Sequence, residues 1–362
     1  QSISNDPVNT FTIGFENQTY DESVHARRVA AHLGTKHREW IVTADDALSV
    51  IPDLPSIYDE PFADVSQIPT LLVSRLARNS VTVALSGDGG DELFAGYNRH
   101  QWAPNIMQKM GYIPQVVRQA LARLAVTPSP QAWDHFFKKV DHLLPTTMKA
   151  SHPGEKIHKI ASILNASGER DLYSRLIRAW NDPIPVLGGQ SHDLVSDHQS
   201  LWGMGDNFTD RMTRLDSVTY LPDDILVKVD RAAMSASLET RVPYLDHNLV
   251  EFIMSLPLEM KIRNGSSKWI LRQVLYRHLP QELMERPKMG FAVPVGEWIR
   301  GPMKEWAEEL IDNKRIEQER YFNAQAVVEM WQQHLSGKFN RTHELWNILM
   351  FQAWLSNNQF GN

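Results

Sequence analysis

The sequence predicts an α/β fold with a parallel sheet near its start and a mostly helical second half. Over the first hundred residues, short apolar runs alternate with amphipathic helical stretches, as strand–helix–strand units around a parallel sheet require. From about Asn98 onward, strand-like runs disappear and helical stretches are separated by proline and glycine. We therefore expect an α/β region over residues 1–97 and a mostly helical region over residues 98–362.

Local signals give the elements of the α/β region. Gly34 is a natural left-handed helix end, and Thr43 followed by Asp46 is typical of a helix start. The near-continuous apolar run 81–85 is typical of a central strand buried under helices on both faces. The expected strands are 10–15, 39–42 and 81–85, and the expected helices are 22–33, 43–51 and 66–78. Residues 181–205, rich in Pro, Gly, Ser and His, are expected to form a long surface loop.

Composition excludes several classes of function. A net charge of −6 argues against nucleic acid as a partner, because phosphate-backbone binding needs a concentrated basic face. No apolar run is long enough to span a membrane and no signal pattern opens the chain, so we expect a cytoplasmic protein. The chain has no cysteine, which excludes disulfides, cysteine-bound zinc and a cysteine nucleophile among these residues.

A glycine- and acid-rich turn follows the run 81–85. It reads Ser86-Gly87-Asp88-Gly89-Gly90-Asp91-Glu92. Glycine lets backbone N–H groups approach an anion, and carboxylates can hold Mg²⁺ or accept a proton. The simpler alternative is a tight turn whose acids complement the dipole of the next helix. The position at the carboxyl end of a strand, where open α/β sheets bind ligands, favours a nucleotide-phosphate site.

Three segments resemble the synthetase domain of the asparagine synthetase family, which includes β-lactam synthetases and amidotransferases of polysaccharide gene clusters. They are residues 86–97, residues 221–246 and the run Arg286-Pro287-Lys288-Met289-Gly290-Phe291. With residues 11–39 they identify the chain, 1–362, as one synthetase-type domain in which residues 1–97 bind the nucleotide. The resemblance implies a Rossmann-like sheet of the adenine nucleotide alpha hydrolase (PP-loop ATPase) type, with ATP and Mg²⁺ as cofactors.

The resemblance also implies a ligase acting on small molecules. Such an enzyme adenylylates the side-chain carboxylate of aspartate, and glutamine-derived ammonia then converts β-aspartyl-AMP to asparagine. A sugar uronic acid or another carboxylate is the alternative substrate, and a scaffold that kept the fold without activity is the alternative class. An α/β hydrolase is excluded because the G-x-S-x-G motif is absent, and a glycosidase because Asp88 and Asp91 belong to one turn.

The resemblance assigns roles around the nucleotide. It places Ser86 and Gly87 against ATP, the backbone of Ile13 at the adenine and Asp21 at Mg²⁺. Asp88 stands where the family has an acidic residue that organises the substrate and can take the proton of attacking ammonia. Asp91, one helical turn on, is expected to face the substrate and the metal.

Cationic and acidic residues further along complete the expected site. Lys288 matches a catalytic lysine that contacts the phosphates and stabilises the departing pyrophosphate. Asp224, Lys228 and Arg231 are expected to bind substrate, with Lys228 or Arg231 meeting a carboxylate. Lys228 and Arg231 are three positions apart and therefore share a helix face, so both could reach one ligand. A lattice of solvent-exposed charges that includes Asp224 fits the same spacing. Glu239, Arg241 and Asp246 are instead expected to form a buried structural ion pair.

The sequence departs from the family pattern at its start. The family has an N-terminal glutaminase domain with a catalytic cysteine, and then a strand that ends in a Ser-Gly-Gly-x-Asp-Ser pyrophosphate loop. Neither occurs in this sequence, so we expect a sheet without its first strand, and a piece of a longer protein that is inactive by itself. The sequence does not decide whether the protein forms a homodimer, because the 11 tryptophans and the apolar residues 345–355 could supply either a core or an interface. We favour core.

Overall fold

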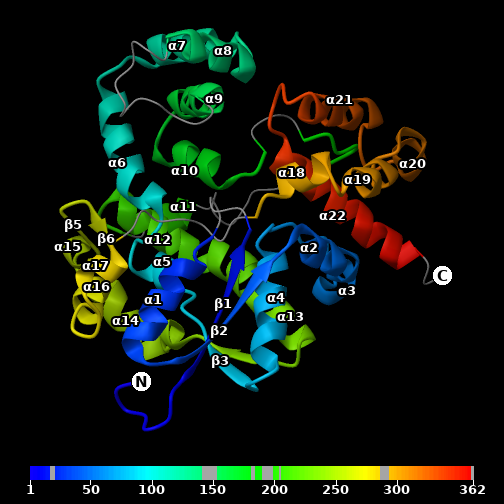
Figure 1. Ribbon diagram of the computed structural model, residues 1–362. Helices are drawn as coiled ribbons and strands as arrows, with labels where there is room; N and C mark the ends of the chain where they lie inside the picture. The colour runs from blue at the N-terminus through cyan, green and yellow to red at the C-terminus, as the bar shows by residue number, and fades with distance from the viewer. Residues whose placement is uncertain are drawn as a thin grey trace. The chain divides into compact units, whose positions relative to one another are not determined.

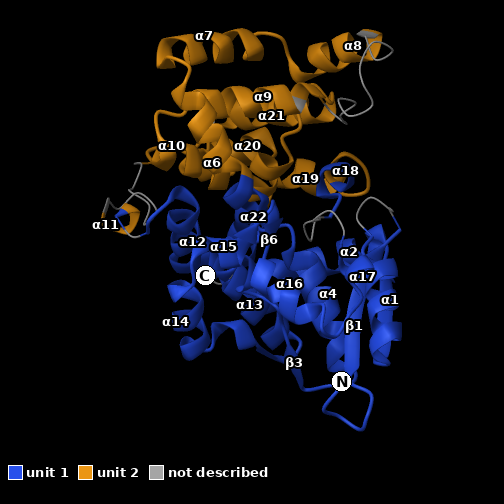
Figure 2. Ribbon diagram, turned by 90° about the vertical axis from the view of Figure 1, so that its left-hand side faces the viewer, with its two compact units in different colours: residues 1–101, 203–298, 350–362 blue, residues 102–202, 299–349 orange. Residues whose placement is uncertain are grey.

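A computed structural model describes residues 1–16, 21–140, 153–180, 184–189, 199–203, 205–285 and 293–359. The chain divides into two compact units, each made of separate stretches (Figure 2). Unit 1 comprises residues 1–101, 203–298 and 350–362, and unit 2 comprises residues 102–202 and 299–349. The chain leaves unit 1 after residue 101, returns to it at residue 203, leaves again after residue 298 and ends in it from residue 350.

Unit 1 begins with a strand–helix–strand unit. Strand β1 pairs in parallel with β2, with Ile13 opposite Trp40, and α1 connects them. In both views β1 lies between α1 and α4 (Figures 1 and 2). The elements are β1 Asn9–Phe15, α1 Ser23–Leu33, β2 Lys36–Val42, α2 Ala44–Val50, a 3₁₀ turn Ile51–Asp53, α3 Leu54–Tyr58, α4 Gln67–Arg78, β3 Val83–Leu85 and α5 Gly90–Leu93.

The helix signals in this region are confirmed. Gly34 ends α1 in the left-handed conformation, with φ 67°. Thr43 accepts a hydrogen bond from the backbone N–H of Asp46, whose carboxylate accepts one from the backbone of Thr43. This reciprocal pair satisfies two backbone donors that the first turn of α2 would leave free.

A second, separate pair of parallel strands joins distant parts of the chain. β3 pairs with β4, Glu239–Arg241, and the backbone N–H of Ser86 donates to the carbonyl of Arg241 at 2.9 Å. Because β4 is three residues long, it leaves no periodic pattern in the sequence, and it was not among the expected strands. The expectation of a buried central strand at 81–85 was wrong, since Leu85 is 74% exposed. The physical cause is that β3 pairs along one edge only within the described sheets.

The remainder of unit 1 is helical apart from a short hairpin. Its elements are α12 Phe208–Val218, a π-helical turn Leu221–Leu226 labelled η5, α13 Val227–Ser235, a 3₁₀ turn Pro243–Leu245, α14 His247–Ser255, α15 Leu258–Lys261, β5 Ile262–Arg263, β6 Ser266–Ser267, α16 Trp269–Leu275 and α17 Gln281–Met284. One core cluster joins Ala77 of α4, Ala233 of α13 and Leu238, the residue before β4, and Phe11 of β1 and Ala84 of β3 pack against it. The cluster holds the two strand pairs to one helical layer.

Unit 2 is built from helices. Its elements are α7 Gln115–Val126, α8 Pro130–Val140, α9 Pro153–Leu164, α10 Glu169–Ile177, α11 Gln199–Trp202, α19 Lys304–Leu310, α20 Asn313–Glu319 and α21 Ala324–Leu335. Three helices contain residues of both units: α6 Asn98–Gly111, α18 Val295–Arg300 and α22 Thr342–Gln359. In unit 2 the buried Arg118 donates to the carbonyls of Leu164 and Ala166 at 3.1 and 2.8 Å.

The helical second half is confirmed, and the C-terminal apolar stretch is core as expected. Leu345 and Trp346 are fully buried, and Leu355 is 7% exposed. Most of the expected loop 181–205 lies outside the described residues, but residues 199–202 form α11. Among the helices that the structure describes, none combines the length and apolar character of a membrane span.

Candidate active site

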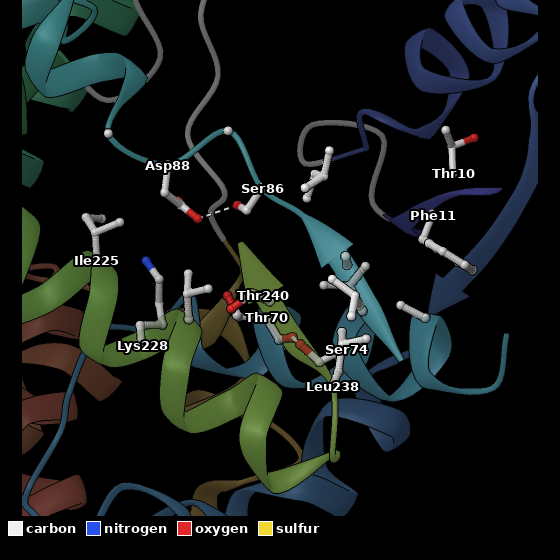
Figure 3. A pocket seen from close by; sticks show the side chains of 18 of the residues that line it. Thr10, Phe11, Thr70, Ser74, Ser86, Asp88, Ile225, Lys228, Leu238 and Thr240 are labelled. Atoms are coloured by element: carbon white, nitrogen blue, oxygen red, sulfur yellow. Dashed lines mark hydrogen bonds between the residues drawn. The ribbon is translucent and has the colours of Figure 1, made fainter. Parts of the chain in front are cut away.

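A cavity of about 1210 Å³ lies within unit 1, between the first strand pair and the second (Figure 3). The start of β1 and the free edge of β3 form two walls, and one face of α4 lies between them. The turn that follows β3 and the helix α13 close the polar end. Lining residues at that end are Asp64, Ser66, Ser86, Gly87, Asp88, Asp91, Glu92, Tyr97, Tyr220 and Lys228.

The cavity brings together half of the site residues expected from sequence. Those that line it are Ser86, Gly87, Asp88, Asp91 and Lys228. They come from two segments more than a hundred residues apart, the turn after β3 and the helix α13. The remaining expected residues are Ile13, Asp21, Asp224, Arg231 and Lys288, and none of them lines this cavity within the described part of the chain.

The turn after β3 depends on two glycines for different reasons. Gly89 has φ +79°, and a side chain there would meet Cδ2 of Leu245 at 2.7 Å. Gly87 has no described atom within 4 Å of the place where a Cβ would stand. The space beside Gly87 is therefore open, and its backbone can be approached by a ligand in the cavity.

Ser86 and Asp88 are held together inside this turn. The hydroxyl of Ser86 donates to Oδ2 of Asp88, and both side chains point into the cavity (Figure 3). Because the turn ends in α5 at Gly90, the carboxylate of Asp88 is carried by ordered backbone on both sides. Serine at 86 therefore orients an acid that can accept a proton or a cationic ligand group.

Asp91 is anchored by a lysine that the sequence did not single out. Nζ of Lys268 lies 3.0 Å from Oδ1 of Asp91. Gly96 packs on the same pair, since a Cβ there would overlap Oδ1 of Asp91 and Cε of Lys268. Lys268 itself has a left-handed φ of 53°, which is uncommon for lysine. No local sequence signal marks this pairing, because Lys268 is far from Asp91 along the chain.

Glu92 and Tyr97 form a second hydrogen bond beside the cavity. The hydroxyl of Tyr97 donates to Oε1 of Glu92. Burial raises the pKa of Glu92, and the hydrogen bond from Tyr97 opposes part of that rise. Burial and the charge of Glu92 also raise the pKa of Tyr97. The guanidinium of Arg99 lies 4.0 Å from the centre of the Tyr97 ring and 5.4 Å from that of Tyr220, so cation–π contacts support this wall.

A nearly buried ion pair lies at the same end of the cavity. Nζ of Lys228 donates to Oδ2 of Asp64 at 2.7 Å and to the hydroxyl oxygen of Ser66 at 2.8 Å. Ser66 in turn donates to Asp64 through its backbone N–H and its hydroxyl. Burial alone would raise the pKa of Asp64, but the ammonium of Lys228 and the bonds from Ser66 hold it below its ordinary value. Asp64 and Ser66 were missed by the sequence analysis, because they lie in an irregular segment before α4.

Asp224 lies in the π-helical turn that leads into α13. Burial, and then the neighbouring carboxylate of Asp64, raise the pKa of Asp224 to about 7. Its Oδ1 is buried without a hydrogen-bond partner among the described atoms. π-Helical turns are rare and occur often at functional sites, and this one leads directly into the helix that carries Lys228 to the cavity.

Two other residues assigned from sequence lie away from this cavity, and a third is not among the described residues. Ile13 is 5% exposed and lines a second cavity of about 460 Å³ beside α1. Arg231 is exposed on α13 and does not line the larger cavity. Lys288 lies outside the described residues. The role of each of the three stays a prediction.

The structure corrects the expectation of a buried ion pair around β4. Nε of Arg241 does lie 2.7 Å from Oε1 of Glu239, but the two side chains are 64% and 55% exposed. Asp246 instead accepts hydrogen bonds from the backbone N–H groups of Asn248 and Leu249 and begins α14. Both side chains belong to a three-residue strand at the surface, so this ion pair is exposed to solvent.

Asp21, the expected Mg²⁺ ligand, lies next to the end of β1. Its Oδ1 accepts a hydrogen bond from the backbone N–H of Ser23 at 2.9 Å. Gly14 makes room for it, because a Cβ there would lie 2.5 Å from that oxygen. Among the described residues, no group of three or more acidic, histidine or cysteine side chains is arranged to hold a metal. The donor set fits Mg²⁺ only as an ion bound through one or two carboxylates and the phosphates of its nucleotide.

Comparison with known proteins shows which family the chain belongs to. The model of the asparagine synthase family matches residues 1–356. The chain is 28% identical over 354 residues to asparagine synthetase [glutamine-hydrolyzing] 1 of Bacillus subtilis, covering 97% of this chain and 52% of that protein. It is 30% identical over 346 residues to a putative asparagine synthetase [glutamine-hydrolyzing] of Mycobacterium tuberculosis, covering 95% of this chain and 50% of that protein. The chain thus spans about half the length of the curated relatives it matches, and it belongs to the asparagine synthase family.

Proposed function

We propose that the protein carrying this chain is an ATP-dependent ligase that converts aspartate to asparagine through β-aspartyl-AMP, with ammonia derived from glutamine. The observation that carries the proposal is the open turn at Gly87, which faces a large cavity beside Ser86 and Asp88. Family membership supports it, and the relatives at 28% and 30% identity have names that state asparagine synthesis and glutamine hydrolysis.

The residues of the turn have different roles in binding and catalysis. The backbone at Gly87 and the hydroxyl of Ser86 meet the nucleotide, while the backbone of Ile13 holds the adenine. Asp88 takes a proton from the attacking ammonia, and Asp91, fixed by Lys268, faces the substrate.

The cationic residues bind the charged groups. Lys228 binds an anionic group of the substrate, with Arg231 and Asp224 in supporting positions. Lys288 neutralises the charge that develops on the departing pyrophosphate, a task suited to a compact and flexible cation.

Mg²⁺ belongs to the same proposal. When bound, the ion neutralises phosphate charge and polarises the phosphorus that the substrate carboxylate attacks. Asp21 would hold it, because its carboxylate lies at the carboxyl end of β1 and has a second oxygen beyond the one bonded to Ser23.

The walls of the cavity favour the presence of an additional strand in the intact protein. Among the described strands, β1 and β3 each pair along one edge, and residues of both strands line the same cavity. A parallel strand between them would cover Leu85 and satisfy the backbone groups that the edges expose. Such a strand, ending in a pyrophosphate loop, would complete a sheet of the PP-loop ATPase type. The glutaminase nucleophile must also come from outside these residues, because they include no cysteine.

The test is ATP–pyrophosphate exchange by the full-length protein, with aspartate and then a panel of sugar uronic acids. We expect aspartate to drive exchange and Lys288→Ala to abolish it. Exchange driven only by a uronic acid would replace asparagine synthesis with amidation of a sugar. If none of the carboxylates drives exchange, the ligase proposal is overturned and a non-catalytic scaffold takes its place.

A further inference from the structure

The ammonium group of Lys228 is held at the polar end of the cavity by two side chains. Its Nζ donates to Oδ2 of Asp64 at 2.7 Å and to the hydroxyl oxygen of Ser66 at 2.8 Å. The side chain of Lys228 is 9% exposed and that of Asp64 is 17% exposed. Two bonds to one nitrogen restrict a side chain that otherwise samples many rotamers, so the protein sets the position of the ammonium group before a ligand enters.

Asp64 and Ser66 are themselves held by the segment between α3 and α4. The backbone N–H of Ser66 donates to Oδ1 of Asp64 at 2.8 Å, and its hydroxyl donates to Oδ2 at 2.7 Å. Tyr58, at the end of α3, stacks on the ring of Phe62 with 4.6 Å between the ring centroids. The hydroxyl of Tyr58 also donates to the backbone carbonyl of Lys228 in a long bond of 3.4 Å. The residues before α4 therefore contact Lys228 both at its backbone and at its ammonium group.

The bonds to Asp64 and Ser66 leave one N–H group of Lys228 for a ligand. An ammonium has three N–H groups, and these bonds use two of them. Because the bonds at the nitrogen are tetrahedral, fixing two N–H directions also fixes the third. Lys228 lines the cavity, and its nitrogen points toward the part of the cavity where Asp88 lies (Figure 3). An anion in the cavity meets a largely desolvated cation, where charge interactions are stronger than in water.

The position of this ion pair at the cavity argues against a role in stability alone. Taking two opposite charges out of water costs free energy that their attraction roughly offsets, so a buried ion pair is weak evidence for stabilisation. A structural pair would also have no reason to line a cavity, whereas Asp64, Ser66 and Lys228 all line this one. A ligand that binds the ammonium group explains both observations.

We propose that Asp64 and Ser66 are positioning residues that aim the third N–H of Lys228 at an anionic group in the cavity. In this scheme neither residue touches the ligand, and both act through Lys228. The identification of the anion with a group of the substrate rests on the proposed function, whereas the fixed anion-binding point does not. Because Asp64 and Lys228 together are neutral, binding depends on the position of the N–H group more than on net charge.

Two variants separate position from charge. Asp64→Glu keeps the negative charge but moves the carboxylate by one methylene, and Ser66→Ala removes one bond to Lys228 without changing any charge. In the exchange assay with the full-length protein, we expect each variant to raise the KM for aspartate about fivefold and to leave kcat within about twofold of wild type. Ser74→Ala is the matched control, because Ser74 is also a buried serine of the cavity wall but donates to the carbonyl of Thr70.

A double-mutant cycle shows whether Ser66 acts through Lys228. If it does, Ser66→Ala has no further effect on the KM for aspartate once Lys228→Met has removed the ammonium group. A general structural role would instead raise KM by the same factor in both backgrounds. Equal factors in the two backgrounds would overturn the inference, as would an unchanged KM in both Ser66→Ala and Asp64→Glu.

A second measurement does not depend on the reaction. Titration calorimetry of the full-length protein with succinate, a carboxylate probe that lacks the amino group of aspartate, reports anion binding directly. We expect Ser66→Ala to weaken succinate binding about fivefold, Lys228→Met to abolish it and Ser74→Ala to leave it unchanged. No succinate binding by wild type, or equal binding by wild type and Lys228→Met, would overturn the inference. If no carboxylate drives exchange, the proposed function fails and the succinate titration alone decides the inference.

Discussion

Gly87 and Gly89 stand two positions apart in one turn, but different constraints act on them. Gly89 needs the left-handed conformation that other residues reach only at a cost, whereas Gly87 borders open space. A structural glycine and a ligand-facing glycine can therefore be separated by experiment. Sequence alone treats the two positions alike, because both are glycines of one motif.

We expect Gly89→Ala to lower the free energy of unfolding by about 1–2 kcal/mol, because alanine is strained at a φ of +79°. Gly87→Ala is expected to leave that free energy within about 0.5 kcal/mol of wild type and to weaken ATP binding at least about tenfold. Denaturant unfolding and nucleotide titration of both variants check this. Normal ATP affinity in Gly87→Ala would show that the nucleotide does not approach this backbone.

Asp224 makes a specific contribution to the pH dependence of stability. Its pKa is about 7 in the folded protein, above the ordinary value of 3.8, so between these values the folded state holds more protons than the unfolded state. Stability therefore falls as pH rises from about 4 to about 7. Asp224→Asn removes this loss, and we expect the variant to gain on the order of 2 kcal/mol relative to wild type between about pH 4.5 and pH 8.

The measurement is urea unfolding of wild type and Asp224→Asn at several pH values. Asp223→Asn serves as the control, because its side chain is exposed and lies in the same turn. A difference between wild type and Asp224→Asn that does not change with pH would mean that Asp224 is ionised in the folded protein throughout.

At the scale of elements, the short strand β3 is the main departure from expectation. The apolar run 81–85 was correctly predicted to contain a strand, and its exposure follows from having one paired edge. Helices α1, α2 and α4 were predictable from patterns close together in the chain, such as the Thr43 cap and the Gly34 end. Strand β4 was not, because pairing with β3 across more than a hundred residues creates it.

The exposed Leu85 offers a direct test of the additional strand. In the full-length protein we expect Leu85→Cys to resist alkylation, because a strand between β1 and β3 would cover it. The chain has no cysteine of its own, which simplifies assignment by mass spectrometry of the labelled peptides. Val116→Cys on α7 is the accessible control, since Val116 is 77% exposed. Labelling of both positions at equal rates would contradict the proposed strand.

The whole chain folds into two compact units, and each is made of separate stretches of sequence. Units of this kind are expected to open with some independence, because each has buried side chains of its own. Tyr173 in α10 and Ile68 in α4 are both fully buried, one in each unit. They are therefore a matched pair for testing independence.

We expect Tyr173→Ala to lower hydrogen-exchange protection in α7, α9 and α10 more than in β1 and β2, and Ile68→Ala to do the reverse. Both truncations leave cavities that cost about 2–5 kcal/mol. Exchange measured by mass spectrometry on the two variants resolves the units. Equal loss of protection across the chain in both variants would show a single cooperative unit.

The sequence by itself determined the α/β start, the helical remainder and the glycine–acid turn after β3, because each depends on residues close together in the chain. The family followed from motifs of the same local kind. Only the tertiary structure decided that Lys268 holds Asp91, and that Asp64 and Ser66 hold Lys228 beside Asp224. These contacts join segments far apart in sequence. Their charges depend on burial, which no local pattern of residues records.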